Sequence, residues 1–125
     1  MPSYLRLRQI CLVASDLAKI VDQLCAVFDI EVCHRDPNVA RYGLTNALMP
    51  VGTSFLEVVS PLVPGQHTAA GRYLKRRGGD GGYMVINDCD DVRRYRDRAT
   101  KLGIGIVEDR SYEAKADLLQ LHPRE

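Results

Sequence analysis

The sequence predicts an α+β fold in which one strand–helix–strand pattern occurs twice. Residues 5–14 alternate and then become continuously apolar, as in a strand with a buried face, and an amphipathic helix follows them. A stretch rich in glycine and proline, 60–82, separates two halves. Beyond it, residues 83–121 repeat the order of the first half. We therefore expect two βαβββ modules that form a cupped mixed sheet.

The first half carries the signals of one complete module. Ser15-Asp16 supplies a helix N-cap, and apolar residues then recur at three- and four-residue steps. They are Leu17, Ile20, Val21, Leu24, Val27 and Phe28. Further strands are expected at 30–33, 39–48 and 53–59, with turns at Asp36-Pro37-Asn38 and at 49–52.

The second half repeats this order but stops early. After a short helix at 68–77, we expect a strand at 83–86, a helix with an apolar stripe ended by Gly103, and strands at 104–107 and 117–121. The stripe consists of Val92, Tyr95, Ala99 and Leu102. The second module thus lacks its last strand in this sequence. We expect a truncated form of a longer protein; the alternative is that a partner chain covers the open sheet edge.

Length and composition predict a single domain over 1–125, with a first module at 1–60, a connector at 61–82 and an incomplete second module at 83–125. Hydrophobic residues make up 46% and charged residues 26%, and the net charge is +1. This balance gives no indication of nucleic-acid binding, and no apolar run is long enough for a membrane span. Four cysteines without a CxxC pair indicate reduced thiols and a cytoplasmic location.

Basic residues gather in two helical segments and have two interpretations. One group is Arg72, Lys75, Arg76 and Arg77; the other is Arg93, Arg94, Arg96, Arg98 and Lys101. Either group could attract a carboxylate, a phosphate or a CoA tail. The interpretation we prefer is a solvated helix face balanced by Asp88, Asp90, Asp91 and Asp97. The glycine cluster at 78–82 lacks the Lys-Ser/Thr ending of a phosphate loop and is interpreted as a hinge between modules.

Four segments resemble, in order, the motifs of the glyoxalase, bleomycin-resistance and extradiol-dioxygenase superfamily, also called vicinal oxygen chelate proteins. They are LRQICLVASDL (7–17), TSFLEVVSP (53–61), YMVINDCDDV (83–92) and LHPRE (121–125). The last of them looks like the turn before the final strand in the methylmalonyl-CoA epimerase branch. The resemblance covers nearly the whole chain and implies paired βαβββ modules around a cupped sheet.

The resemblance also implies a metal site with one ligand from each of four strands. Gln9 matches the first position, as in the glutamine variant of the family, and Glu57 matches the second, where it would also be the catalytic residue. The third position falls on Gly81, or at best Tyr83, and the fourth lies beyond the end of the sequence. Such ligands suit divalent Zn, Ni, Co, Mn or Fe, which would act as a Lewis acid on substrate oxygens.

The residues themselves give independent support for a site at Gln9 and Glu57. Both lie in apolar strands, where an unpaired polar group is costly. Strand alternation places Glu57 on one face with Phe55 and Val59, either at the floor of the cup or toward solvent. His34 and His122 are candidates for the missing histidine, but we expect His34 at the surface and His122 in a structural turn. A third histidine, His67, is expected to be exposed.

Three classes of function therefore stay open. The first is a metal-dependent lyase, isomerase or dioxygenase acting on a small molecule in the cup. The second is a metal-free protein that binds or sequesters a small molecule, and the third is an interaction domain without a ligand. No Ser-His-Asp or Cys-His arrangement can be placed. We expect a homodimer, because an open sheet edge gains by pairing.

Overall fold

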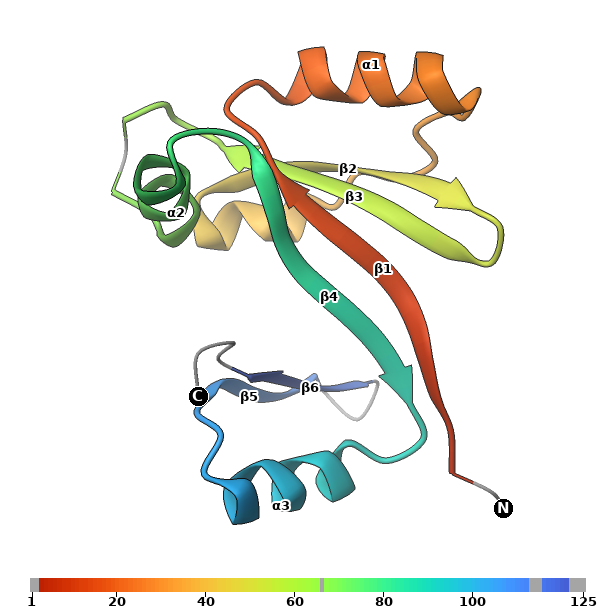
Figure 1. Ribbon diagram of the computed structural model, residues 1–125, viewed down its shortest axis with the longest axis vertical. Helices are drawn as coiled ribbons and strands as arrows, with labels where there is room; N and C mark the ends of the chain where they lie inside the picture. The colour runs from red at the N-terminus through yellow and green to blue at the C-terminus, as the bar shows by residue number, and fades with distance from the viewer. Residues whose placement is uncertain (1–2, 66, 113–115, 122–125) are drawn as a thin grey trace. The chain divides into compact units, whose positions relative to one another are not determined.

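The computed structural model describes residues 3–65, 67–112 and 116–121, which form six strands, three α-helices and one 3-10 helix (Figure 1). Two compact units are present. One comprises Leu7–Asn87, and the other comprises Met1–Arg6 with Asp88–Glu125. The α+β fold class is confirmed.

The unit Leu7–Asn87 is organised around a four-stranded sheet in the order β2-β3-β1-β4. The strands are β1 (Leu5–Val13), β2 (Leu44–Val51), β3 (Ser54–Pro61) and β4 (Gly81–Cys89). Strands β2 and β3 form an antiparallel hairpin, whereas β1 pairs with β3 in parallel. The tight turn between β2 and β3 needs a residue with positive φ, and Gly52 supplies it at φ 60°. This register determines which polar side chains share a face.

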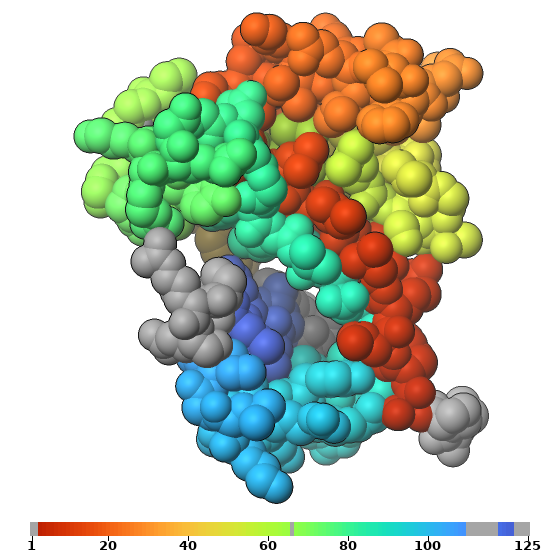
Figure 2. All heavy atoms as spheres, viewed as in Figure 1, coloured from red at the N-terminus to blue at the C-terminus, as the bar shows by residue number. Residues whose placement is uncertain are grey.

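Helix α1 (Leu17–Phe28) covers one face of the sheet. It begins where the Asp16 carboxylate accepts the Lys19 backbone N–H, and it ends at Asp29 in the left-handed conformation. Its apolar stripe packs on the sheet within one buried cluster, to which α1 itself contributes Val21, and the atoms of α1 lie directly against the β2–β3 hairpin (Figure 2). Val27 and Phe28, which were expected in this stripe, are exposed. The cluster consists of Ala14, Val21, Ala47, Met49 and Val58. This face of the sheet is therefore an ordinary apolar core.

The opposite face holds a second, smaller core. Helix α2 (Ala69–Arg77) packs there through Ala70, Tyr73 and Leu74 against Cys11, Val13 and Val59. The 3-10 helix η1 (Pro37–Tyr42) lies on the side of the hairpin away from α1 (Figure 1). Because successive side chains of a strand point to opposite faces, Gln9 and Glu57 share this second face with Cys11 and Val59.

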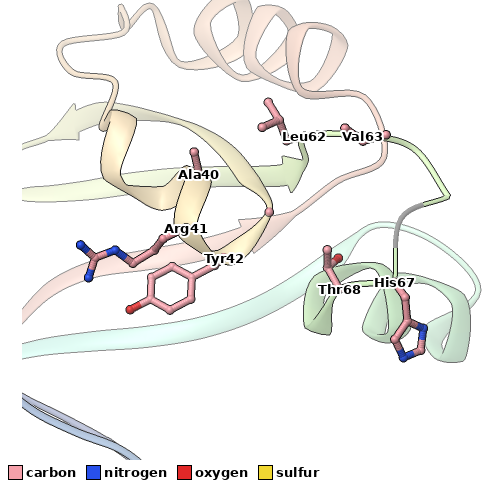
Figure 3. A pocket seen from close by; sticks show the side chains of 8 residues that line it. Ala40, Arg41, Tyr42, Leu62, Val63, His67 and Thr68 are labelled. Atoms are coloured by element: carbon pink, nitrogen blue, oxygen red, sulfur yellow. The ribbon is translucent and has the colours of Figure 1, made fainter.

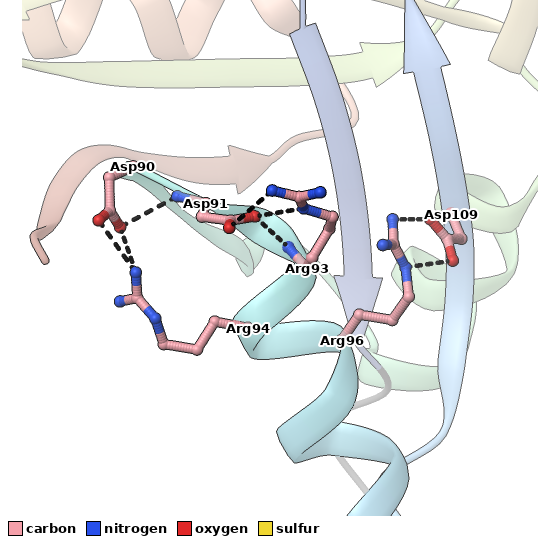
Figure 4. Close-up of polar contacts among 6 residues, drawn as sticks. All are labelled: Asp90, Asp91, Arg93, Arg94, Arg96 and Asp109. Atoms are coloured by element: carbon pink, nitrogen blue, oxygen red, sulfur yellow. Dashed lines mark hydrogen bonds and ion pairs between the residues drawn. The ribbon is translucent and has the colours of Figure 1, made fainter.

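The second unit contains α3 (Val92–Leu102) and the antiparallel pair β5 (Ile106–Tyr112) and β6 (Ala116–Leu121). Exposed ion pairs surround α3 (Figure 4). Arg96 donates from Nε and Nη2 to the Asp109 carboxylate at 2.7 and 2.6 Å. Arg93 pairs with Asp91, and Arg94 pairs with Asp90. The prediction that Asp90 and Asp91 balance basic residues of α3 is therefore confirmed for Arg93 and Arg94, whereas Arg96 pairs with Asp109, which was not predicted, and Asp88 pairs with Arg6.

In the first half two predicted strands differ from the structure, and one proline explains much of the difference. The expected strand at 30–33 is not formed; only an isolated bridge joins His34 to Leu48. The expected strand at 39–48 begins at Leu44, because Pro37 enters the first turn of η1 and the Asp36 side chain accepts the Asn38 N–H. In the second half the strands expected at 83–86 and 104–107 are found as the longer β4 and β5.

The glycine cluster also has defined structure. Gly78 ends α2 with φ 82°, and β4 already begins at Gly81. The segment is therefore a helix end followed by a strand start, and its interpretation as a hinge between modules stays a prediction. In the described part of the chain, no helix combines the length and the apolar composition needed to cross a bilayer. The predicted module boundaries at 60 and 82 stay a prediction.

The ion pair between Arg96 and Asp109 makes the stability of this unit depend on pH. Hydrogen bonds from Arg96 hold the pKa of Asp109 below its ordinary value. The pair therefore contributes stability above the ordinary pKa of an aspartate, and this contribution is lost as pH falls through the lowered pKa. We expect Asp109→Asn to lower the unfolding free energy slightly at neutral pH, since solvent screens an exposed pair.

Urea unfolding of both proteins at neutral and at strongly acidic pH checks this expectation, with Asp97→Asn as a control on the same unit. The difference between Asp109→Asn and the unchanged protein should disappear in acid. A difference of the same size at both pH values would contradict the assignment.

Candidate functional site

The structure brings Gln9 and Glu57 together on the sheet face opposite α1. Gln9 Nε2 donates to Glu57 Oε1 at 2.7 Å, and each residue is only 7% exposed. Gln9 lies in β1 and Glu57 in the neighbouring parallel strand β3. The alternation predicted for Glu57 is confirmed, and the interpretation in which both side chains face solvent is wrong. A role for them as metal ligands stays a prediction.

Asn46 completes this cluster, and sequence reasoning missed it. Its Nδ2 donates to Glu57 Oε2 at 2.7 Å, while its Oδ1 accepts the backbone N–H of Asp36 at 2.9 Å. Asn46 lies opposite Val59 in the β2–β3 register and is therefore diagonal to Glu57 on the same face. The signal was an asparagine inside an apolar strand. The sequence alone does not show which β3 residues lie beside Asn46, because the register of β2 against β3 is set by the turn at Gly52.

Each oxygen of the Glu57 carboxylate thus accepts a hydrogen bond from an amide of a neighbouring strand. Gln9, Asn46 and Glu57 together form a polar cluster across β1, β2 and β3, which we call the Glu57 cluster. A buried carboxylate is costly unless donors satisfy its oxygens, and here two do so. The segment that precedes η1 fixes one end of the cluster through Asp36. The arrangement holds the carboxylate in a defined orientation.

A cysteine lies directly beside the cluster. Cys11 is opposite Glu57 in the β1–β3 register and is 2% exposed. Burial raises the pKa of its thiol well above the ordinary value, and the Glu57 carboxylate raises it further. Burial likewise raises the pKa of the nearby Tyr83, with Cys11 and Tyr73 adding to the effect and Arg72 opposing it. Cys11 is therefore a protonated thiol at neutral pH, which is a poor nucleophile.

The described residues do not fit a divalent metal site of the expected kind. The Glu57 cluster offers one carboxylate and two amides, and the Gln9 amide is turned with its N–H toward Glu57. At Gly81, where the third ligand was expected, an added side chain would meet the Arg77 guanidinium. The described part of the chain contains no group of three or more His, Cys, Asp or Glu side chains that would hold a metal ion.

The histidines considered as substitutes lie elsewhere. His34 is exposed and bridges to Leu48 through its backbone, so the prediction of a surface position is confirmed. His67 is also exposed, as expected. His122 lies outside the described residues. No described histidine therefore joins the Glu57 cluster.

Two of the hollows in the described part of the unit Leu7–Asn87 are lined by other residues than Gln9 and Glu57. The first has a volume of about 460 Å³ and lies between the end of η1 and the segment that leads into α2. Its lining includes Tyr42, Leu62 and Thr68, and in Figure 3 the Arg41 guanidinium points away from the His67 imidazole. The second hollow, of about 420 Å³, lies beside α2.

The hydrogen bonds of Asn46 should contribute measurably to stability. Asn46→Ala leaves one oxygen of the Glu57 carboxylate and the Asp36 N–H without their partners. Leaving buried groups unsatisfied costs about 1–3 kcal/mol each, so we expect a loss of about 2 kcal/mol or more in the free energy of unfolding. Urea unfolding measures it, and Asn38→Ala, an exposed asparagine in η1, is the matched control. Equal effects of the two substitutions would contradict the cluster.

No family model matches the chain, and no curated protein matches it at sequence level. Solved structures do match. Methylmalonyl-CoA epimerase from Mycobacterium tuberculosis has a TM-score of 0.78 at 19% identity, over 95% of this chain and 79% of that one. The Streptomyces coelicolor epimerase with 2-nitronate-propionyl-CoA has a TM-score of 0.78 at 23% identity, covering 95% and 88%.

A hypothetical protein from Bacillus halodurans C-125 has a TM-score of 0.80 at 16% identity, over 96% of this chain and 86% of that one. Another epimerase structure holds methylmalonyl-CoA and NH4+. These likenesses extend over nearly the whole chain, as the motif resemblance does. The chain therefore has the fold of the vicinal oxygen chelate superfamily, to which the methylmalonyl-CoA epimerases belong.

Proposed function

We propose that this protein binds an acyl-CoA thioester on the sheet face that carries the Glu57 cluster, and that Glu57 is the base that acts on the ligand. The observation that carries this proposal is a buried carboxylate held by two amides in the middle of the sheet. Its burial costs free energy that an apolar side chain at the same place would not cost. Such a cost is typical of a site retained for function.

The class of ligand is supported by two of the similar structures, which hold methylmalonyl-CoA and a propionyl-CoA derivative. A proton on the carbon next to a thioester carbonyl is acidic enough for a carboxylate to remove it. In this proposal an oxygen of Glu57 takes that proton, while Gln9 and Asn46 keep the carboxylate oriented. The electron pair of the broken C–H bond moves onto the thioester oxygen as an enolate, and protonation of the opposite face of the same carbon inverts its configuration and completes an isomerase reaction.

We propose that the chain does this without a resident divalent metal. Two observations support this. The cluster offers one carboxylate and two amides as metal ligands, and at Gly81, where a further ligand was expected, the Arg77 guanidinium occupies the place of a side chain. A protein that only binds the thioester, without catalysis, agrees with the same geometry. Exchange of the ligand's α-proton with solvent separates binding from catalysis, because it needs the base but no second catalytic group.

The experiment follows exchange of the α-proton of propionyl-CoA in D₂O by NMR, together with calorimetric titration of the same ligand. We expect saturable binding, and exchange that Glu57→Gln lowers by about 100-fold or more, the usual contribution of a general base. Glu31→Gln, an exposed glutamate in the same unit, should leave both unchanged. Binding without exchange would leave a thioester-binding protein, whereas the absence of saturable binding would overturn the proposal.

A metal-dependent lyase, isomerase or dioxygenase is the second candidate. It is favoured by one observation, the adjacency of Gln9 and Glu57 at 2.7 Å on the strands where the resemblance places two ligands. Elemental analysis of the purified protein separates the two candidates. Stoichiometric Zn, Ni, Co, Mn or Fe that is lost in Glu57→Gln but not in Glu31→Gln would establish the second candidate in place of the first.

A further inference from the structure

The hollow beside α2 lies where two parallel strands end. Ser15 follows the end of β1, Pro61 is the last residue of β3, and both line this space of about 420 Å³. The helix passes along its other side with Gly71, Arg72 and Lys75 in the lining. Loops at the carboxyl ends of parallel strands are a common position for ligands. The volume is sufficient for a phosphate or pyrophosphate group.

The charge of this hollow is unbalanced. Arg72 and Lys75 are three residues apart on α2 and so share one side of the helix, and both side chains are exposed. No aspartate or glutamate is among the lining residues, and neither cation has an ion-pair partner in the part of the chain that the structure describes. The nearby Asp80 carboxylate accepts hydrogen bonds from the backbone N–H and the hydroxyl of Ser15, at 2.9 and 3.3 Å.

Helix α3 carries paired and unpaired cations: Arg98 and Lys101 have no ion-pair partner among the described residues either, and Arg72 and Lys75 differ from them because both line a hollow. Arg93, Arg94 and Arg96 each have a carboxylate partner. The interpretation as a solvated, charge-balanced face therefore accounts for these arginines but not for Arg72 and Lys75. Arg72 and Lys75 line one hollow and lack ion-pair partners among the described residues, and together they offer the donors that recognise a phosphate group, paired donors from the arginine and a point charge from the lysine.

We propose that this hollow binds a phosphate or pyrophosphate group through Arg72 and Lys75. The site is separate from the Glu57 cluster, and the proposal does not depend on the function proposed above. The Ser15 hydroxyl, now directed to Asp80, is a further donor at the edge of the hollow. The source of the phosphate is either a free anion or the diphosphate of a nucleotide, and the test distinguishes them.

The test titrates the full chain with inorganic pyrophosphate and with ADP at constant ionic strength, followed by calorimetry and by NMR of the backbone amides. We expect saturable binding that perturbs Ser15 and the amides of α2. The double variant Arg72→Gln/Lys75→Gln should weaken it by about tenfold or more, because two charge-assisted contacts are lost. The matched control is Arg98→Gln/Lys101→Gln, which removes the same two charges at the same spacing from exposed positions of α3.

Each outcome is decisive. Loss of pyrophosphate binding in the α2 variant alone supports the site and, if ADP binds no more tightly, identifies a free anion as the source. Tighter binding of ADP with the same dependence on Arg72 and Lys75 identifies a nucleoside diphosphate. Equal weakening in both double variants would show a general effect of charge and overturn the proposal, as would the absence of saturable binding of either probe. Thermal unfolding of both variants verifies that they are folded.

Discussion

The burial of one carboxylate is the constraint on which the candidate site depends. Glu57 lies in the central part of the sheet, where water does not satisfy its oxygens, so neighbouring strands must supply donors. Gln9 supplies one from β1 and Asn46 supplies the other from β2. The two hydrogen bonds therefore require a fixed register among β1, β2 and β3. A shift of β3 by one residue would move Glu57 to the face covered by α1 and leave it without partners.

The two faces of the sheet therefore differ in composition and in role. Against α1 the sheet presents an apolar core, with Met49 and Val58 fully buried. That core stabilises the unit without any polar group. The opposite face carries the Glu57 cluster, a protonated Cys11 and, farther along, the packing of α2. Stability from the first face allows the second to keep groups that cost free energy to bury, which is the usual condition of a binding or catalytic site.

Much of this could be predicted from the sequence because it depends on periodicity. Alternation in 53–59 placed Glu57, the stripe of α1 placed its helix, and Gly103 gave the end of α3. Asn46 could not be placed, since its position on the Glu57 face depends on the turn at Gly52. The strand expected at 39–48 was too long at its start, because the local effect of Pro37 outweighed the apolar pattern. The pairing of Arg96 with Asp109 could not be predicted either, because the two residues are brought together only by the tertiary structure.

The central claim is that the Glu57 cluster serves a ligand and not the stability of the sheet. Replacing all three residues together, as Gln9→Leu, Asn46→Leu and Glu57→Leu, and measuring both unfolding free energy and thioester binding tests it most directly. Apolar replacement of a complete buried polar group is commonly neutral or stabilising, by up to about 4 kcal/mol, whereas binding requires the polar atoms. We predict a protein that no longer binds the thioester and that loses at most the contribution of the Asp36 N–H, whose acceptor Asn46 is removed, about 1–3 kcal/mol. A strongly destabilised protein that still binds it would contradict the account.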